Sequence, residues 1–337
     1  MEYAMKLNEI FSNNLVFAKG KPIRIFGTGK GTGEITFMGI TKSVVLNGDF
    51  WQVEFPKSNY GGPFTLTATL NGETTVLDNI YIGEVFVYAG QSNLQFKLES
   101  STSPKELYET NPLLRLYSPN RLDNEEFFFP KDGWVMAEKD TVGKWTALGY
   151  LASNATQKQK GVAVGVITCY QGASVIESWL PSGELKKHGI DIPIEEKFID
   201  HQVPAYKVWN KDGMLYEYAL GQILPFSVSA VVWYQGESDA HGKEAEIYDK
   251  ELEILISCWK KAFNDSTLPF VIVQLADCEE RLGEGWLNVQ KAQERVCERI
   301  PKTALVISKD VCETNDIHPP TKHLLAERIS AELIKLV

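Results

Sequence analysis

From residue 81 onward, short apolar runs alternate with longer stretches that have helical periodicity. The expected strands span residues 84–89, 161–168, 228–234, 270–275 and 304–308, and the expected helices span residues 147–160, 244–263, 287–299 and 321–336. Apolar strands joined by helices are typical of a parallel sheet that is covered on both faces. The pattern predicts an α/β domain of flavodoxin-like three-layer α/β/α type, in which ligands bind at the carboxyl ends of the strands.

The first 80 residues follow a different pattern, with short β-rich segments, turn residues between them and no helical period. Asn-Gly pairs at residues 47–48 and 71–72 suit type I′ hairpin turns, because both central residues adopt positive φ. We expect an N-terminal antiparallel β-sandwich domain over residues 1–80 and the α/β domain over residues 81–337. The glycine-rich run at residues 27–33 lacks the Ser or Thr of a phosphate loop, and we interpret it as a hairpin loop.

The charge balance and the first residues limit the expected partners. Lys and Arg total 34 against 44 Asp and Glu, a formal net charge of −10, and an acidic chain repels phosphate backbones and anionic lipid headgroups. We expect no nucleic-acid partner. The start lacks the basic end and apolar run of a signal peptide, and no later run reaches the length of a membrane span, so we expect no membrane association and a cytoplasmic location. A homo-oligomer is allowed on general grounds alone.

The five cysteines are odd in number and widely spaced along the chain. This spacing suits neither a disulfide framework nor a metal-binding knuckle. We interpret them as reduced, mostly buried thiols and expect no metal site.

The first expected strand of the α/β part runs directly into Gly90, Gln91, Ser92 and Asn93. A serine at a tight turn from strand to helix is lifted above the sheet edge, and the free N–H groups of the following helix point at any negative charge that develops there. Ser92 is therefore the candidate nucleophile. The alternative for these four residues alone is a helix N-cap, a position that serine favours.

Two later strand ends carry candidates for stabilising an oxyanion. Gly172 follows the second expected strand, and its N–H is a candidate donor because glycine allows a ligand to approach the backbone closely. Ser174, two residues further along, is a weaker candidate nucleophile. Gln235 follows the third expected strand, and its side-chain amide is a further candidate donor. Glu237 either orients neighbouring groups or lies on a solvated loop.

The loop before the last expected helix contains the candidate general base. It reads Asn-Asp-Ile-His-Pro at residues 315–319. Residues two apart in an extended segment face the same side, so the Asp316 carboxylate is expected to contact the His318 imidazole, fix its tautomer and stabilise its cation. The other four histidines have no comparable neighbourhood, and His318 is the candidate base.

Taken together, these motifs resemble the SGNH hydrolase superfamily, and specifically its sialate O-acetylesterase and acetylxylan esterase branch of carbohydrate esterases. The resemblance rests on Gly-Gln-Ser-Asn at 90–93, on residues 171–179, on Trp-Tyr-Gln-Gly-Glu-Ser-Asp at 233–239 and on Asp-Ile-His-Pro at 316–319. It extends over the N-terminal β-rich segments. The resemblance implies a serine O-acetylesterase with no metal or organic cofactor, which acts on a small acetylated sugar or oligosaccharide.

The resemblance also implies roles for individual residues. Ser92 corresponds to the nucleophile and His318 to the base. The implied oxyanion donors are the Ser92 N–H, the Gly172 N–H and the Gln235 side chain. We further expect contacts to the substrate from four residues of these motifs: Gln91, Asn93, Glu237 and Trp179.

Three positions depart from the family pattern, and the first is Leu94, where many relatives have Met. The family acid usually lies three residues before the histidine, where this chain has Asn315. Asp316 is therefore the expected acid, and Asp310, Glu237 or a Ser-His dyad remain as alternatives. Ala173 replaces a glycine that is common in the second motif.

The substrate stays open between acetylated sialic acid and a neutral acetylated glycan such as xylan or mannan. A sialate carboxylate would need a basic partner, and three arginines lie in expected loops: Arg115, Arg121 and Arg281. Four tryptophans near expected loops offer faces for sugar rings, although we expect at least half of them to cover the core: Trp134, Trp179, Trp209 and Trp286. A non-catalytic glycan-binding protein is the alternative from another class. It predicts loss of the serine or the histidine, and both are present.

Overall fold

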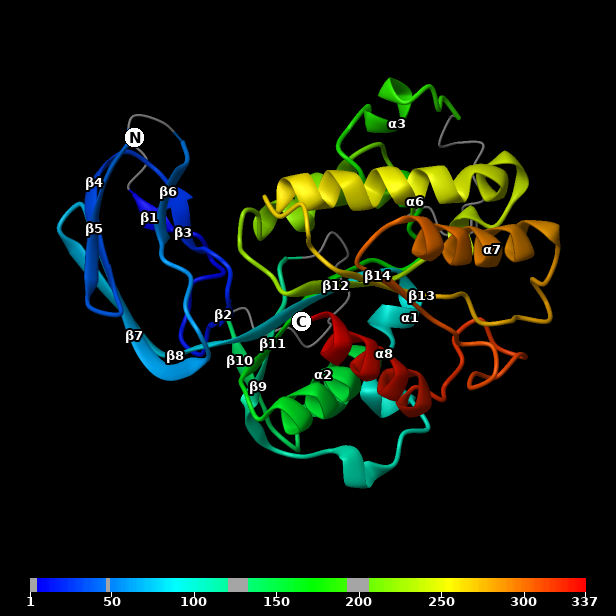
Figure 1. Ribbon diagram of the computed structural model, residues 1–337, viewed down its shortest axis with the longest axis horizontal. Coiled ribbons are helices and arrows are strands. Elements are labelled where there is room, and N and C mark those ends of the chain that lie inside the picture. Colours follow the sequence, from blue (N-terminus) through cyan, green and yellow to red (C-terminus); the bar gives the residue numbers. More distant parts are fainter. Residues whose placement is uncertain (1–4, 47–48, 121–132, 193–205) are drawn as a thin grey trace.

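The longest strand, β8, connects the N-terminal strands to the rest of the protein. The structure is a computed structural model that describes residues 5–46, 49–120, 133–192 and 206–337 (Figure 1). The first part of β8 (Glu73–Gly90) pairs antiparallel with β7 (Gly61–Leu70). Its second part pairs parallel with β11 (Val164–Tyr170) and β12 (Ala230–Tyr234). The predicted domain boundary after residue 80 lies within β8, and the division at that position stays a prediction.

The α/β part contains a mixed sheet with strand order β10-β9-β11-β8-β12-β13-β14. The predicted strands of this part are confirmed, including β13 (Phe270–Val273) and β14 (Thr303–Val306). Successive strands from β9 to β14 pair parallel in this order, and β10 pairs antiparallel with β9 at the edge. The carboxyl ends of the parallel strands therefore meet at one edge of the sheet, as the strand and helix pattern requires.

Two strands of this sheet are not among the predicted ones, β9 (Asn111–Tyr117) and β10 (Val135–Ala137). The apolar run of β9 is interrupted by a proline and by Arg115, which hides its strand character. Arg115 is buried because its guanidinium donates to the carbonyl oxygens of Asn14 (3.2 Å) and Asn79 (2.8 Å) and lies 4.3 Å from the centre of the Tyr81 ring. A buried arginine in which each guanidinium nitrogen donates to an oxygen is compatible with a strand interior.

Long helices cover both faces of this sheet. Figure 1 shows α6 (Gly242–Ala262) and α7 (Glu284–Arg299) together on one face and α2 (Ala147–Lys160) and α8 (His323–Leu336) together on the other. These four match the predicted helices to within a few residues. The shorter helices are α1 (Ser92–Gln95), α3 (Glu184–Lys187), α4 (Tyr206–Trp209) and α5 (Met214–Tyr218).

The N-terminal strands form two groups. One is a three-stranded antiparallel sheet of β1 (Lys6–Leu7), β3 (Ile23–Thr28) and β6 (Trp51–Phe55). The other is attached to β8 and contains β2 (Val16–Ala18), β4 (Gly31–Phe37), β5 (Ile40–Leu46) and β7.

The turn predictions for this part have mixed outcomes. The hairpin at Asn71 and Gly72 is confirmed, with φ of 49° and 86°, whereas the pair at 47–48 lies outside the described residues. The hairpin interpretation of residues 27–33 is wrong, because β3 and β4 belong to different sheets and do not pair. The glycines there permit close packing instead: a Cβ on Gly27 would lie 1.9 Å from the carbonyl oxygen of Lys6.

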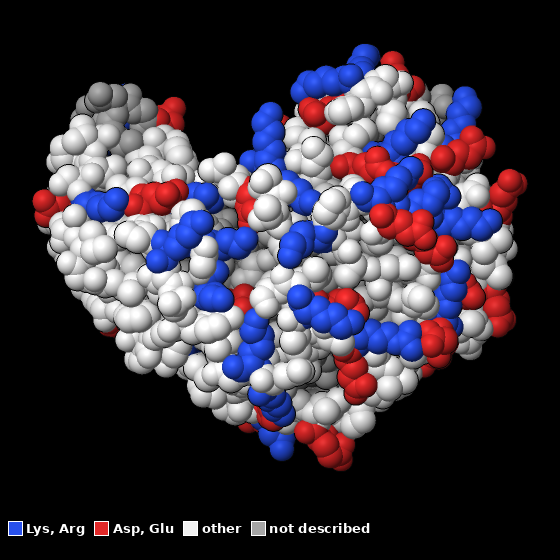
Figure 2. Space-filling view, in the orientation of Figure 1, with Lys and Arg blue, Asp and Glu red and all other residues white. Residues whose placement is uncertain are grey.

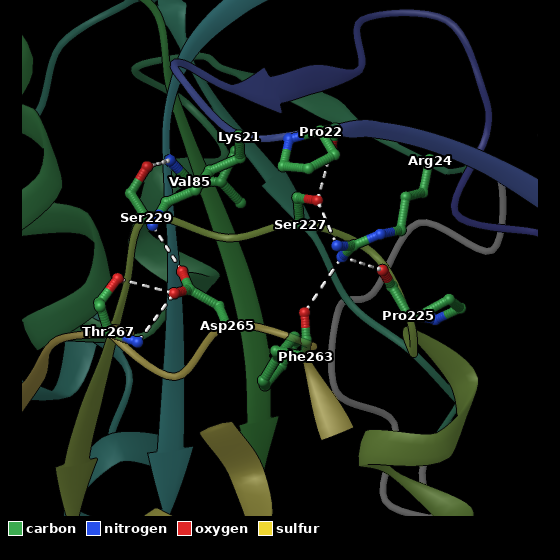
Figure 3. Close-up of polar contacts among 10 residues, drawn as sticks. All are labelled: Lys21, Pro22, Arg24, Val85, Pro225, Ser227, Ser229, Phe263, Asp265 and Thr267. Carbon is green, nitrogen blue, oxygen red and sulfur yellow. Dashed lines mark hydrogen bonds and ion pairs between the residues drawn. The ribbon is translucent and has the colours of Figure 1, made fainter. Parts of the chain in front are cut away.

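Arg24 on β3 joins the N-terminal strands to the α/β part, as Figure 3 shows. Its side chain is almost fully buried, with 4% exposed surface for the residue. Nη1 donates to the carbonyl oxygens of Phe263 (3.0 Å) and Pro225 (3.3 Å) and to Oγ of Ser227 (3.3 Å). One buried side chain therefore satisfies three acceptors that follow the last turn of α6 or precede β12.

Replacing Arg24 with methionine is expected to lower the free energy of unfolding by about 1–3 kcal/mol, because these buried acceptors lose their donor. Chemical denaturation measures the change. Lys21→Met is the matched control, since Lys21 bonds Asp265 at 2.5 Å in a partly exposed ion pair (Figure 3) and such pairs contribute about 0–1 kcal/mol. Equal stability of the two variants would contradict the proposed role of Arg24.

Basic side chains gather in the furrow between the N-terminal strands and the α/β part, as Figure 2 shows. Two hollows of about 360 and 230 Å³ lie there, with lysines in their walls: Lys19, Lys21, Lys57 and Lys302. The second hollow is also lined by Ser229 and Pro269, which directly precede β12 and β13. It therefore lies at the amino ends of the strands, on the edge of the sheet opposite Ser92. Within the described parts of the chain, no helix has both the length and the apolar composition to cross a membrane.

Candidate active site

Ser92 lies at the sharp turn between β8 and α1, as predicted from the sequence. Gly90 makes this turn possible, since its φ is 143° and a Cβ there would lie 2.1 Å from the carbonyl oxygen of Tyr234 on β12. Only a glycine fits so close to a neighbouring strand with positive φ. Ser92 is the first residue of α1 and is partly exposed at the carboxyl edge of the sheet.

The structure brings Ser92 and His318 into direct contact. Oγ of Ser92 lies 2.7 Å from Nε2 of His318, although 226 positions separate the two residues in the sequence. Burial lowers the pKa of His318 below its ordinary value of 6.5, and the Lys322 and Arg281 cations lower it further, while Asp316 acts in the opposite direction. The ring is therefore neutral at pH 7, the state in which it can accept a proton from the serine hydroxyl.

Asp316 does not make the contact with the imidazole that the sequence predicts. Its Oδ1 accepts a hydrogen bond from the backbone N–H of His318 at 2.8 Å. The prediction assumed an extended segment, but Ile317 and His318 form a bend, and an aspartate in a bend bonds the backbone two residues on. Its carboxylate remains near enough to favour the protonated ring.

The alternative acids are also occupied elsewhere. Asp310 forms a two-fold ion pair with Arg328 at 2.6 and 2.7 Å, and Glu237 accepts from the side chain of Asn93. Among the residues that the structure describes, no carboxylate accepts a hydrogen bond from Nδ1 of His318. The geometry is that of a Ser-His dyad with the Asp316 carboxylate close by.

Replacing Asp316 with asparagine is expected to lower kcat by less than about 10-fold, whereas the same change in a Ser-His-Asp triad costs about 10⁴-fold. The reason is that an asparagine oxygen can still accept from the His318 N–H. Initial rates on a chromogenic acetate ester measure the effect, with Asp310→Asn as the control. A loss near 10⁴-fold would instead place the Asp316 carboxylate on the imidazole during turnover.

Two backbone N–H groups flank the serine. A Cβ on Gly172 would lie 3.7 Å from Cβ of Ser92, so the Gly172 backbone is next to the nucleophile. The Gly172 N–H donates to Oε1 of Gln95 at 2.8 Å, and the Ser92 N–H has no backbone acceptor among the described residues. An amide oxygen therefore occupies the position at the Gly172 N–H that a developing oxyanion would need.

Gln235 is not available as an oxyanion donor in this structure, which corrects the sequence-based prediction. Its side chain has no exposed surface. Nε2 donates both hydrogens, to the carbonyl oxygen of Ser174 (2.9 Å) and to Oδ2 of Asp239 (2.5 Å), and Oε1 accepts from the Tyr248 hydroxyl (2.7 Å). The amide connects the loop after β12 to the loop after β11 and has no donor left for a ligand.

The four predicted substrate contacts are also buried. Gln91, Asn93, Glu237 and Trp179 have at most 3% exposed surface. Oε1 of Gln91 accepts from two backbone N–H groups after β12, and Nε1 of Trp179 donates to Oγ of Ser174. These side chains therefore lie in the interior beneath the site, where they hold neighbouring loops in place, and they do not line the site. The buried position of Ser174 also excludes it as a rival nucleophile.

The tryptophan prediction is confirmed in its core-covering part. Trp134, Trp179, Trp209 and Trp286 are all buried, so none presents a face to a sugar ring.

The departure from the family pattern at Ala173 has a structural consequence, since its φ is 52°. That left-handed conformation favours glycine.

Lys322 is a buried residue of the site that the sequence pattern did not indicate. Its Nζ donates to Oδ1 of Asn93 at 2.7 Å, and Nδ2 of Asn93 donates to Oε1 of Glu237 (2.7 Å) and to the carbonyl oxygen of Ile317 (2.9 Å). Burial lowers the pKa of Lys322 to about 8 and raises that of Glu237 to about 7. One signal was present in the sequence: a lysine beside the first turn of a helix, where acidic residues are favoured, four positions after the base.

One buried group among the described residues has the spacing of metal ligands, and it consists of Asp239, Glu244 and Glu251. Each of these carboxylates already interacts with other groups of the protein, and Asp239 accepts from the Gln235 side chain. We assign no metal to them.

The chain is also similar to known proteins in sequence and in fold. The sequence model of one family, described as carbohydrate esterase, sialic acid-specific acetylesterase, matches residues 82–334. The chain belongs to this family. It is therefore a carbohydrate esterase, a carboxylic ester hydrolase whose reaction is O-deacetylation of carbohydrates.

Individual relatives resemble this carbohydrate esterase along most of its length. The sialate O-acetylesterases of Pongo abelii and Homo sapiens are each 24% identical to it over 363 residues, which cover 94% of this chain and 68% of each relative. The structure of a carbohydrate acetylesterase from Xanthomonas citri superposes with a TM-score of 0.85 at 23% identity, over 98% of this chain and 75% of that one. This likeness confirms the α/β fold with a large mixed sheet.

The arginines predicted to receive a sialate carboxylate differ in position within the esterase. Arg115 is buried in β9 and bonded to backbone carbonyls, so that prediction is wrong. Arg121 lies outside the described residues. Arg281 is partly exposed, and its charge helps to lower the pKa of both His318 and His241. Of the two arginines that the structure describes, Arg281 is therefore the one that lies near the candidate base, His318.

Proposed function

We propose that this esterase uses Ser92 as its nucleophile and His318 as its general base, through an acetyl-serine intermediate. The observation that carries the proposal is the 2.7 Å contact between Oγ of Ser92 and Nε2 of His318. A neutral imidazole within hydrogen-bond reach of a serine at a strand-to-helix turn is the arrangement that nucleophilic catalysis needs.

In the first half-reaction, Nε2 of His318 takes the hydroxyl proton while Oγ of Ser92 attacks the acetyl carbonyl carbon. The carbonyl oxygen becomes negative and accepts from the N–H groups of Ser92 and Gly172, after the Gln95 oxygen has left the Gly172 N–H. The tetrahedral intermediate collapses when the bond to the sugar oxygen breaks. His318 gives its proton to that oxygen, and the sugar alcohol leaves.

In the second half-reaction, a water molecule takes the place of the sugar alcohol. His318 removes a proton from the water, and the resulting hydroxyl attacks the acetyl carbon. The bond to Oγ breaks, His318 returns the proton to Ser92, and acetic acid leaves and gives its proton to bulk water, which yields acetate. The catalytic groups are then in their starting state.

The proposal includes the finer description of the fold. We interpret the helix pairs on the two faces of the sheet as the outer layers of a three-layer SGNH domain, and the first strands as a β-sandwich. The positions of α6 and α7 on one face and α2 and α8 on the other support this interpretation (Figure 1).

The proposed substrate class is an O-acetylated sialic acid or a short sialylated sugar. The names of the relatives and the position of Arg281 near His318 support this choice, because a guanidinium matches a carboxylate in geometry and charge. A neutral acetylated oligosaccharide, such as one from xylan or mannan, is the second candidate. It is favoured by the net charge of −10, which a sialate must overcome locally.

Acetate release from a panel of O-acetylated sialic acids and acetylated plant oligosaccharides tests the proposal. Release from the sialic acids is expected, and Ser92→Ala protein gives the background rate. Release from neutral oligosaccharides alone would remove the sialate assignment. No release above background from any member of the panel would overturn the proposed activity.

A further inference from the structure

We propose that Lys322 is a positioning residue, a buried cation that acts through Asn93 to hold the His318 loop against Ser92. The inference deepens the proposed function and rests on it, because it takes His318 as the base that activates Ser92.

A continuous set of hydrogen bonds connects Lys322 to the catalytic loop. Nζ of Lys322, immediately before α8, donates to Oδ1 of Asn93 on α1. Nδ2 of Asn93 donates to the carbonyl oxygen of Ile317, the residue before His318. Asn93 itself follows Ser92 directly, so the nucleophile and the loop of the base are tied to one buried amide.

The neighbours of Asn93 fix its amide in one orientation. Lys322 can only donate, so it requires the amide oxygen. Glu237 and the Ile317 carbonyl accept in this geometry, so both require the amide nitrogen. If Lys322 lost its donor, the amide oxygen would be buried without a partner, and the bond to the Ile317 carbonyl would lose its support.

The position of Lys322 is costly for a side chain that only packs. The residue has no exposed surface, and burial of a cation is unfavourable unless it is paired. Among the described residues its side chain bonds an amide oxygen and no carboxylate, and Nζ lies 4.9 Å from the centre of the Phe96 ring. A cation next to the amino end of a helix is also disfavoured by the helix dipole. Costly charges of this kind cluster at functional sites.

Lys322 acts on His318 in a second way, since its positive charge lowers the pKa of the imidazole in addition to the hydrogen bonds through Asn93. Lys322 and Arg281 disfavour the protonated ring, and Asp316 favours it. Lys322 is itself faced by Cys312, Glu237, Glu313 and Asp316. Removal of the lysine charge therefore raises the pKa of His318, and the pH above which the base is neutral moves upward.

Phosphonylation of Ser92 by a fluorophosphonate tests the proposal on the full chain, because this reaction needs the Ser92 and His318 pair and no sugar. Lys322→Met is expected to lower the maximal phosphonylation rate by about 10-fold or more at unchanged probe affinity. It should also move the acid limb of the rate to higher pH by about half a unit. Lys322→Arg keeps the charge and should keep the limb near its wild-type position. Lys335→Met, an exposed position on α8 that pairs with Glu332, is the control and should change neither quantity.

An unchanged rate and an unchanged limb in folded Lys322→Met protein would overturn the positioning role. If that variant fails to fold by circular dichroism, Lys322→Gln replaces it, since glutamine keeps a donor but lacks the charge, and the same limb shift is expected. Absence of Ser92 labelling in the wild-type protein would instead contradict the proposed function, so the two failures are distinguishable.

Discussion

Replacing Ser92 with alanine is expected to lower kcat for acetate release by about 10⁴-fold or more, with little change in KM. Oγ of Ser92 is the atom that attacks the acetyl carbonyl carbon, and we expect it to contribute little to substrate binding in the ground state. Initial rates on a chromogenic acetate ester and on an acetylated sugar measure the loss, and the thermal midpoint checks the fold.

The matched control is Ser266→Ala. Ser266 is exposed in the turn between α6 and β13, at the edge of the sheet opposite Ser92, and its loss should leave the rates unchanged. A Ser92→Ala protein that keeps a tenth of the wild-type kcat would rule out the acetyl-serine mechanism.

Replacing His318 with glutamine is expected to lower kcat by about 10⁴-fold, because His318 is the described side chain that is hydrogen-bonded to Oγ of Ser92 and can take its proton. The pH dependence gives a second readout. The active form of the ring is neutral, and the pKa of His318 lies below 6.5, so wild-type kcat/KM should rise with pH through a midpoint below 6.5 and then level off. The variant should lose this acid limb.

The control for this variant is His188→Gln. His188 is exposed after α3 and pairs with Glu184, so neither the rate nor the pH profile should change. A wild-type midpoint above 6.5 would show that the surroundings of His318 favour its cation, contrary to the burial and the positive charges around it.

Much of the fold could be predicted because it depends on short stretches of sequence. The strand before Ser92 is a continuous apolar run, and the four long helices have clear periodicity. β9 was missed for a tertiary reason: Arg115 interrupts its apolar pattern, and the partners that make its burial tolerable are carbonyls of Asn14 and Asn79. These carbonyls come from distant parts of the chain.

In the candidate site, too, the positions of the residues could be predicted from the sequence, whereas the partners of their side chains could not. The positions of Ser92, Gly172 and His318 at one edge of the sheet follow from the order of strands, and the structure brings the three together. Gln235 lies at the predicted strand end, but its amide turns to Asp239 and Tyr248. A sequence motif shows that a side chain such as the Gln235 amide can donate hydrogen bonds, but it does not show which acceptors in the folded protein receive them.

The amino-acid sequence by itself determined where each strand ends and which reactive groups stand there, because these properties depend on neighbours a few residues away. Only the tertiary structure decided what each group bonds. The Gln235 side chain donates to the carbonyl oxygen of Ser174, 61 positions away, and Lys322 donates to Asn93, 229 positions away, whereas Asp316 bonds the nearby backbone N–H of His318. The physical reason is that a buried polar group must find a partner in space, and for several groups of this site that partner comes from a remote segment that the fold places beside it.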